Sequence, residues 1–187
     1  MKLNIRALIG VVLSLMVSTL AEAGQMELSG SFSFQQTNYG SSSNTQWSRR
    51  WNASAGYVFW DGYEEIEISV TDAFYRTQIS GFEDTSYHDQ IYSLNFVQGF
   101  TSRNSYVQPF VKVGIGQLNR DASGSVSGGS SPPAQYDALT AVLGAGLKVY
   151  LSRRVGLKAE GTTYLSGALL STWKDNFAFS FGVSLYL

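Results

Sequence analysis

The chain has 187 residues, of which 14% are charged and 14% are aromatic, with a net charge of −1 and a mean hydropathy of −0.05. This length suffices for one domain with a sizeable core, and the near-neutral charge gives no electrostatic support for nucleic-acid binding. The absence of cysteine excludes a disulfide framework, a thiolate metal site and a lipid-modified N-terminal cysteine.

The first 23 residues have the three parts of a cleavable export signal. Lys2 and Arg6 supply a positive start, residues 7–20 are apolar, and residues 21–23 (AEA) fit a cleavage site. The apolar run is short for a membrane span, which needs roughly 20 residues. We therefore predict a signal peptide over residues 1–23 and a mature domain over residues 24–187. No later stretch suits a spanning helix, so a membrane-bound form would have to be a closed barrel.

Two stretches of alternating residues follow, over residues 26–35 and 46–59. In the first, Leu28, Phe32 and Phe34 share one parity and polar residues occupy the other. Successive side chains of a strand point to opposite faces, so each stretch is predicted to be a strand with one apolar face. Arg49 interrupts the apolar face of the second strand near the polar loop 37–45, at a height where a cation could meet lipid head groups.

Residues 64–73 and 86–98 are the next two predicted strands. Asp61-Gly62, just before the first of them, is a strong signal for a tight hairpin turn. Residues 75–85 between the two strands are predicted to be a long loop, and residues 99–104 a turn.

The fifth predicted strand, residues 105–118, contains the pair Pro109-Phe110 followed by Gly114 and Gly116. Proline removes one donor from a β-ladder, so its place inside a strand is costly. Parity assigns four side chains of this strand to the inner face: Tyr106, Gln108, Phe110 and Lys112.

The segment 119–133 is rich in Gly, Ser and Pro and cannot bury a core, so it is predicted to be a flexible loop. Strands over residues 139–151 and 155–165 follow, separated by a short turn at 152–154. A further long loop is predicted over residues 166–174.

The last stretch, residues 176–187, alternates strictly between large apolar residues and small or polar ones. A soluble sheet would turn the large residues inward, whereas a membrane barrel turns them toward lipid. The final octet, SFGVSLYL, resembles the C-terminal signal by which outer-membrane barrels are recognised for assembly, although Leu stands last where an aromatic residue is usual. The residues assigned to this signal are Ser180, Gly182, Leu185 and Leu187.

Eight strands, with short turns alternating with longer loops, are typical of outer-membrane barrels. Together with the motif from Pro109 to Gly116 and the final octet, this pattern resembles the OmpA-like outer-membrane β-barrel superfamily, at the size of the small stand-alone OmpX/Ail type. The resemblance implies an all-β fold, an eight-stranded antiparallel transmembrane up-and-down β-barrel, in the outer membrane of a Gram-negative bacterium with both termini in the periplasm. A soluble lipocalin-like barrel is the structural alternative, with its large residues inside.

Parity also predicts a charged lumen. An eight-stranded barrel is just wide enough for its side chains to fill, and buried charges must be paired or hydrogen-bonded. Acids of the first and third strands are therefore expected to pair with lysines of the fifth to seventh strands as a plug of salt bridges; a gated ion path is the alternative. The residues of this predicted charge network are Glu27, Glu65, Glu67, Lys112, Lys148, Lys158 and Glu160.

The sequence offers little for catalysis. Some small outer-membrane barrels act on lipid A with His and Ser, and His88 has Ser86 on the same strand face, with Asp89 and Glu83 near. No motif of those enzymes surrounds His88, so we predict no enzyme activity, no catalytic residue, no cofactor and no metal site.

The predicted role is therefore structural or surface-interacting: envelope integrity, adhesion, or binding of host or other cell-surface ligands through extracellular loops. A small porin-like ion channel is the first alternative, and a lipid A-modifying enzyme is a weaker one. Expected partners are outer-membrane lipids and lipopolysaccharide, the barrel-assembly machinery and periplasmic chaperones, and the protein is expected to be a monomer.

Overall fold

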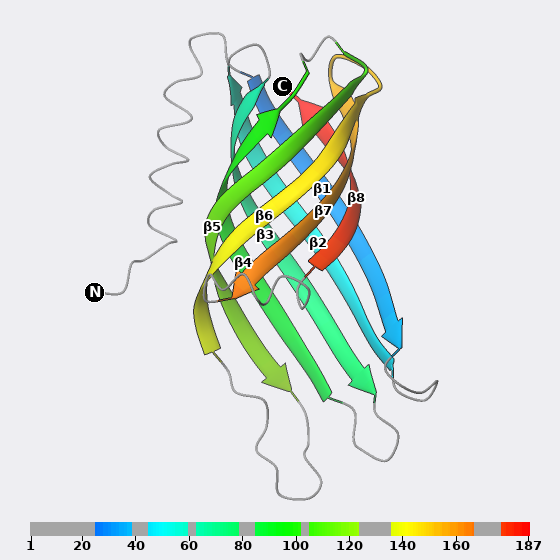
Figure 1. Ribbon diagram of the computed structural model, residues 1–187, viewed down its shortest axis with the longest axis vertical. Coiled ribbons are helices and arrows are strands. Elements are labelled where there is room, and N and C mark those ends of the chain that lie inside the picture. The colour runs from blue at the N-terminus through cyan, green and yellow to red at the C-terminus, as the bar shows by residue number, and fades with distance from the viewer. Residues whose placement is uncertain are drawn as a thin grey trace, which may run out of the picture.

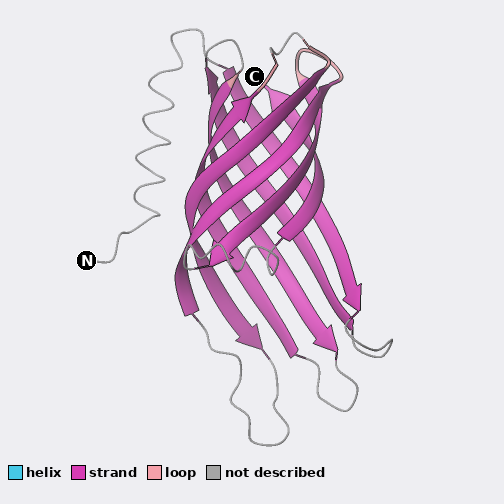
Figure 2. Cartoon of the chain, in the orientation of Figure 1, coloured by secondary structure: helices cyan, strands magenta, loops and turns pink. Residues whose placement is uncertain are grey.

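A computed structural model describes residues 25–38, 45–59, 63–78, 85–101, 105–123, 136–166 and 177–187. These residues form one closed barrel of eight strands (Figures 1 and 2). The strands are β1 (Gln25–Asn38), β2 (Thr45–Phe59), β3 (Glu64–Gln78), β4 (Thr85–Gly99), β5 (Val107–Ser123), β6 (Tyr136–Tyr150), β7 (Val155–Ser166) and β8 (Phe177–Tyr186). Among the described residues, no helix has the length and apolar composition that crossing a membrane requires.

Each strand pairs antiparallel with its neighbours in the sequence, and β8 returns to β1. In that closing pair, Glu27 to Phe32 lie opposite Phe181 to Tyr186. The backbone continues the closure, because Leu187 N donates to Met26 O at 2.9 Å. The predicted all-β, eight-stranded antiparallel up-and-down barrel is therefore confirmed.

The two faces of the barrel wall have opposite chemistry, as the alternation predicts. Phe179 and Phe181 on the outer face of β8 are 66% and 71% exposed, whereas Ser184 on its inner face is 1% exposed. A soluble lipocalin-like barrel would reverse this arrangement. The apolar face therefore points outward and the polar face lines the interior, which is the arrangement of membrane barrels.

Several strands are longer than predicted. β3 continues through Tyr75 to Gln78, and β5 continues from the predicted loop to Ser123. The two extensions belong to one sheet, because β4 pairs with both, for example at Ser86 with Arg76 and with Ser123. Polar and small residues predict loops at these positions, but such residues suit any water-facing or lumen-facing surface and do not show where backbone pairing stops. The prediction for Tyr106 was also wrong: it precedes β5 and is 84% exposed instead of pointing inward.

The connections between strands fall into two sets, one at each end of the barrel. One end, where the chain also ends, has the connections 60–63, 100–106 and 151–154 (Figure 1); we call it the turn end. The opposite, loop end has the connections 39–44, 79–84, 124–135 and 167–176, all of which lie outside the described residues. Because β3 and β5 run further than predicted, two of the predicted long loops are shorter than expected. The predicted signal peptide also lies outside the described residues.

Candidate functional site: the lumen

The structure brings all seven residues of the predicted charge network together inside the barrel. Their side chains come from five strands, yet each is nearly inaccessible, from 0% exposed for Glu67 to 7% for Glu160. They form two groups that differ in their balance of acids and lysines. Both lie toward the turn end, where Glu65 and Glu67 open β3 and Lys148 lies near the end of β6.

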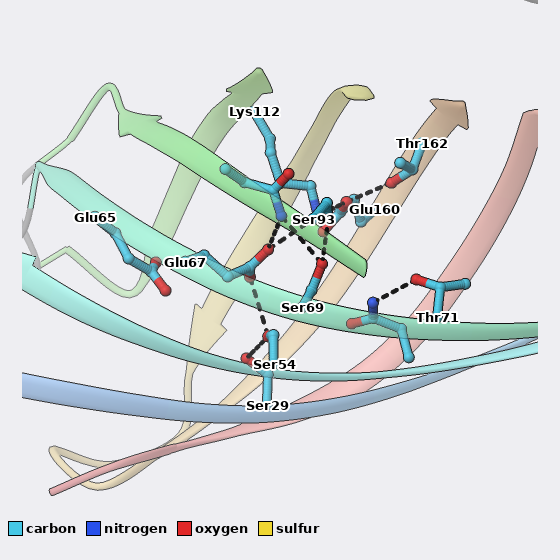
Figure 3. A network of polar contacts seen from close by, with 12 residues as sticks. Ser29, Ser54, Glu65, Glu67, Ser69, Thr71, Ser93, Lys112, Glu160 and Thr162 are labelled. Carbon is cyan, nitrogen blue, oxygen red and sulfur yellow. Dashed lines mark hydrogen bonds and ion pairs between the residues drawn. The ribbon is translucent and has the colours of Figure 1, made fainter. Parts of the chain in front are cut away.

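The first group is a closed cycle of four side chains, which we call the charge ring: Glu67, Lys112, Lys158 and Glu160. Figure 3 shows three of them, Glu67, Lys112 and Glu160. Lys112 Nζ lies 3.4 Å from Glu67 Oε1 and also contacts Glu160 Oε1. Lys158 Nζ lies 3.1 Å from Glu67 Oε2 and 3.1 Å from Glu160 Oε2. Each of the four carboxylate oxygens therefore contacts one ammonium group, and the ring is electrically balanced.

Neutral donors complete the charge ring. Asn95 Nδ2 donates to Glu67 Oε1 at 3.0 Å, and Ser54 Oγ donates to Glu67 Oε2 at 3.0 Å. The Thr162 hydroxyl donates to Glu160 Oε1. A buried ion pair is favourable only when further hydrogen bonds satisfy the remaining lone pairs, and these donors meet that requirement.

The second group, which we call the lysine bridge, consists of Glu27, Glu65 and Lys148. Lys148 Nζ donates to Glu27 Oε2 at 2.5 Å and to Glu65 Oε2 at 2.7 Å. The other oxygen of Glu27 accepts hydrogen bonds from Ser184 Oγ at 2.7 Å and from Ser29 Oγ at 3.0 Å. The lysine bridge thus connects β1, β3 and β6 across the lumen.

An aromatic ring lies between the two groups. Lys148 and Lys158 are direct cross-strand partners on β6 and β7, a pairing of like charges that is unfavourable by itself. The Phe110 ring centroid lies 5.7 Å from Lys148 Nζ and 5.2 Å from Lys158 Nζ. The negative face of an aromatic ring attracts a nearby cation, so Phe110 offsets part of this repulsion.

Glycine on the inner face provides the space for these long side chains. A Cβ at Gly56 would lie 1.9 Å from Glu65 Oε1, and one at Gly146 would lie 2.6 Å from Phe110 Cζ. Each glycine therefore marks a place where a side chain from another strand rests against the barrel wall. This explains why glycine stands on the inner face at these two positions.

Beyond the charge ring, toward the loop end, the lumen is closed by apolar side chains. Ile91, Leu118, Val142 and Tyr164 form one buried cluster, each at most 4% exposed. We call this cluster the apolar belt. It was not predicted, because Ile91 and Leu118 belong to strands whose inner face otherwise reads as polar.

A further layer of the lumen, nearer the loop end than the apolar belt, combines arginine with tyrosine. Arg120 donates two hydrogen bonds of 2.6 Å to the Asp89 carboxylate, and its guanidinium carbon lies 4.4 Å from the Tyr87 ring centroid. Arg50 Nη2 donates to the Tyr75 hydroxyl at 2.5 Å, and the rings of Tyr75 and Tyr87 are stacked 4.6 Å apart. Sequence reasoning did not identify this layer. Tyr87 and Asp89 lie within the predicted strand 86–98, whereas Tyr75 and Arg120 lie past the predicted ends of β3 and β5, where continuing the parity would have placed them inside.

The described part of the barrel interior contains small cavities. One of about 10 Å³ lies beside the lysine bridge and is lined by Glu65, Gln108, Tyr150 and other residues. Another of about 20 Å³ lies between the charge ring and Arg50. Each has room for about one water molecule.

The remaining predicted residues lie on β8 or on the outer face. Leu185 and Leu187 point outward, and Ser180 and Gly182 point inward, in the strand that closes the barrel. His88 lies on the outer face, with its Nε2 2.6 Å from Asp72 Oδ2, whereas Asp89 points inward to Arg120. Among the described residues, no group of three or more His, Cys, Asp or Glu side chains is arranged to hold a metal ion.

Comparison with known proteins identifies the fold. No family model matches the sequence, and no curated protein matches it. Among solved structures, the N-terminal β-barrel domain of Pseudomonas aeruginosa OprF has a TM-score of 0.57 and 18% identity, with 88% of this chain and 100% of that chain covered. Pseudomonas aeruginosa OprG has a TM-score of 0.58 and 11% identity, with 88% and 95% covered.

A third similar structure is Ail of Yersinia pestis in complex with the heparin analogue sucrose octasulfate. Its TM-score is 0.56 and its identity 16%, with 89% of this chain and 100% of that chain covered. At such low identity the likeness concerns the fold alone. The chain therefore has the fold of small eight-stranded outer-membrane barrels of the OmpA-like type, as the sequence predicts.

Proposed function

We propose that the protein is an integral outer-membrane barrel with a sealed lumen and a structural or surface-interaction role. The outward apolar face, the polar interior and the shared fold of OprF, Ail and OprG support a membrane location. The predicted export signal supports passage out of the cytoplasm.

The observation that best supports a sealed lumen is that successive layers of side chains with different chemistry fill it. An ion entering from the turn end would first meet the lysine bridge and the charge ring, where Lys148 and Lys158 each already contact two carboxylates. It would then meet the apolar belt, where it would lose hydration without compensation. A conducting pore would need both layers to rearrange, so we favour the plug over the porin-like channel.

A surface role would fall to the connections at the loop end, which we propose to be extracellular, with both termini in the periplasm. Loops on a rigid scaffold commonly carry binding functions. The structure of Ail contains a sulfated sugar, which supports polyanionic cell-surface ligands as one class to test. Outer-membrane lipids and lipopolysaccharide, the barrel-assembly machinery and periplasmic chaperones complete the proposed partners, with the protein as a monomer.

We propose no catalytic role. The imidazole of His88 contacts Asp72 on the outer face of the barrel, outside the polar lumen.

Purified protein in planar lipid bilayers tests the sealed lumen. Insertion is first verified by the different gel migration of unboiled and boiled protein. We then expect conductance near the bilayer baseline, and binding of sulfated glycans or lipopolysaccharide only when the loops are intact. Steady, ion-selective current through the wild-type barrel would contradict the plug and favour the channel.

A further inference from the structure

The charges of the lumen are balanced in one group and unbalanced in the other. In the charge ring, two carboxylates face two ammonium groups. In the lysine bridge, Glu27 and Glu65 share Lys148 alone. The turn-end part of the lumen therefore has one negative charge more than its lysine neutralises.

The lysine bridge, which has this excess negative charge, also contains one carboxylate oxygen without a hydrogen-bond partner in the described part of the chain. Glu65 is 3% exposed, and its Oε1 has no hydrogen-bond partner among the described residues. The atom rests against the wall at Gly56, where a Cβ would lie 1.9 Å away. Glu27 differs, since both of its oxygens are hydrogen-bonded. Figure 3 shows Glu65 standing apart from the Glu67, Lys112 and Glu160 side chains.

Space for a small ligand lies beside Glu65. The cavity of about 10 Å³ has oxygen-bearing side chains around it, and it admits a particle of about the size of one water molecule. Lys148 lies 2.7 Å from the same carboxylate, so a multivalent ion would be repelled. Arg50 contacts Tyr75 and Tyr164 in the loop-end half of the lumen, away from this cavity.

We propose that Glu65 binds one singly charged cation in this cavity, supplied as a proton or as an alkali ion. A buried carboxylate without compensation is costly, and one added positive charge makes the lysine bridge neutral. The charged and titratable groups that face the site come from six elements: Tyr63 before β3, Glu27 on β1, Glu67 on β3, Lys148 and Tyr150 on β6, Lys158 on β7 and Tyr186 on β8.

The inference rests on the sealed lumen proposed above, but its test measures stability rather than conductance. Wild type and Glu65→Gln are compared by the thermal midpoint of the barrel in detergent, from about pH 5 to pH 9, where free Lys and Tyr side chains keep their charge state. Midpoints in choline chloride are compared with those in sodium chloride or potassium chloride at the same concentration. His88 is present in both proteins, so its contribution is common to wild type and variant.

If the cation is a proton, the folded state holds it while the unfolded state releases it, so wild-type stability falls by several degrees as the pH rises. If it is an alkali ion, wild type at high pH is several degrees more stable in sodium or potassium than in choline. Glu65→Gln should show neither dependence. Glu67→Gln, which unbalances the charge ring, should lower the midpoint at every pH as the matched control.

Identical dependence on pH and on cation in wild type and Glu65→Gln overturns the proposal. Should Glu65→Gln fail to fold, the infrared spectrum of wild type decides. A carbonyl stretch from a protonated, solvent-shielded carboxylic acid at neutral pH supports the proton. Absence of that band, together with midpoints that are equal in sodium, potassium and choline, excludes both the proton and the alkali ion and overturns the proposal.

Discussion

Replacing Lys158 with Met should destabilise the barrel strongly, because it removes one corner of the charge ring. Lys158 Nζ lies 3.1 Å from a carboxylate oxygen of both Glu67 and Glu160, in a site where the lysine side chain is 5% exposed. Breaking a buried ion pair by removing one partner costs about 3–5 kcal/mol, since the remaining charge stays buried. A loss of 1 kcal/mol lowers the thermal midpoint by about 2–4 °C in a domain of this size. The expected fall is therefore roughly 6–20 °C.

The assay is thermal unfolding in detergent, followed by circular dichroism and by gel migration. Leu157→Met, on the outer face of the same strand, is the matched control and should leave the midpoint nearly unchanged. The double replacement Lys158→Met with Glu160→Gln restores equal numbers of acids and lysines in the ring and should recover much of the loss. The reasoning is refuted if Lys158→Met unfolds within a degree or two of wild type, or if the two substitutions are simply additive.

Three further predictions concern sealing, assembly and topology. Leu118→Ser puts a hydroxyl into the apolar belt and should admit water. Measurable conductance is expected only when this change is combined with Lys158→Met. Current through Lys158→Met alone would show that the apolar belt does not seal the lumen. Leu185→Asp with Leu187→Asp places charge on the lipid side of the closing strand, so periplasmic degradation is expected instead of outer-membrane insertion, and normal membrane levels would contradict the assigned assembly signal. An epitope inserted beside Gly128 should be reached by antibody on whole cells; access only after permeabilisation would reverse the proposed topology.

The period of two carried most of what the sequence could predict. Because the parity of a strand residue decides its face, Glu27, Lys112 and Lys158 could be assigned to the interior without knowing any partner. Parity says nothing about which lysine meets which acid, since that depends on strand tilt and closure. Lys148 reaches Glu27, 121 positions earlier in the chain, and no local signal encodes that contact.

The ends of the strands were predicted less well than their faces. Arg120 looks like a loop residue by composition, yet it lies on β5 and pairs with Asp89 inside the barrel. A polar residue is equally suited to a lumen and to a loop, so composition cannot distinguish the two. The end of a strand is better judged from its neighbour: the alternation of faces should be followed for as long as the partner strand continues, because backbone pairing continues with it.

The positions of the charged groups explain why a barrel of this size retains charges that apolar side chains could replace. An apolar interior would make both faces of every strand alike, and a shift of one residue would then carry no penalty. The charge ring joins β3, β5 and β7, and the lysine bridge joins β1, β3 and β6; neither group joins two strands that are neighbours in the sheet. A one-residue slip of β3 would move Glu65 and Glu67 to the lipid face and leave three lysines in the lumen with too few acids. The two groups therefore specify the register of strands across the lumen, where backbone pairing cannot reach, and any plug they form is a consequence of the same arrangement.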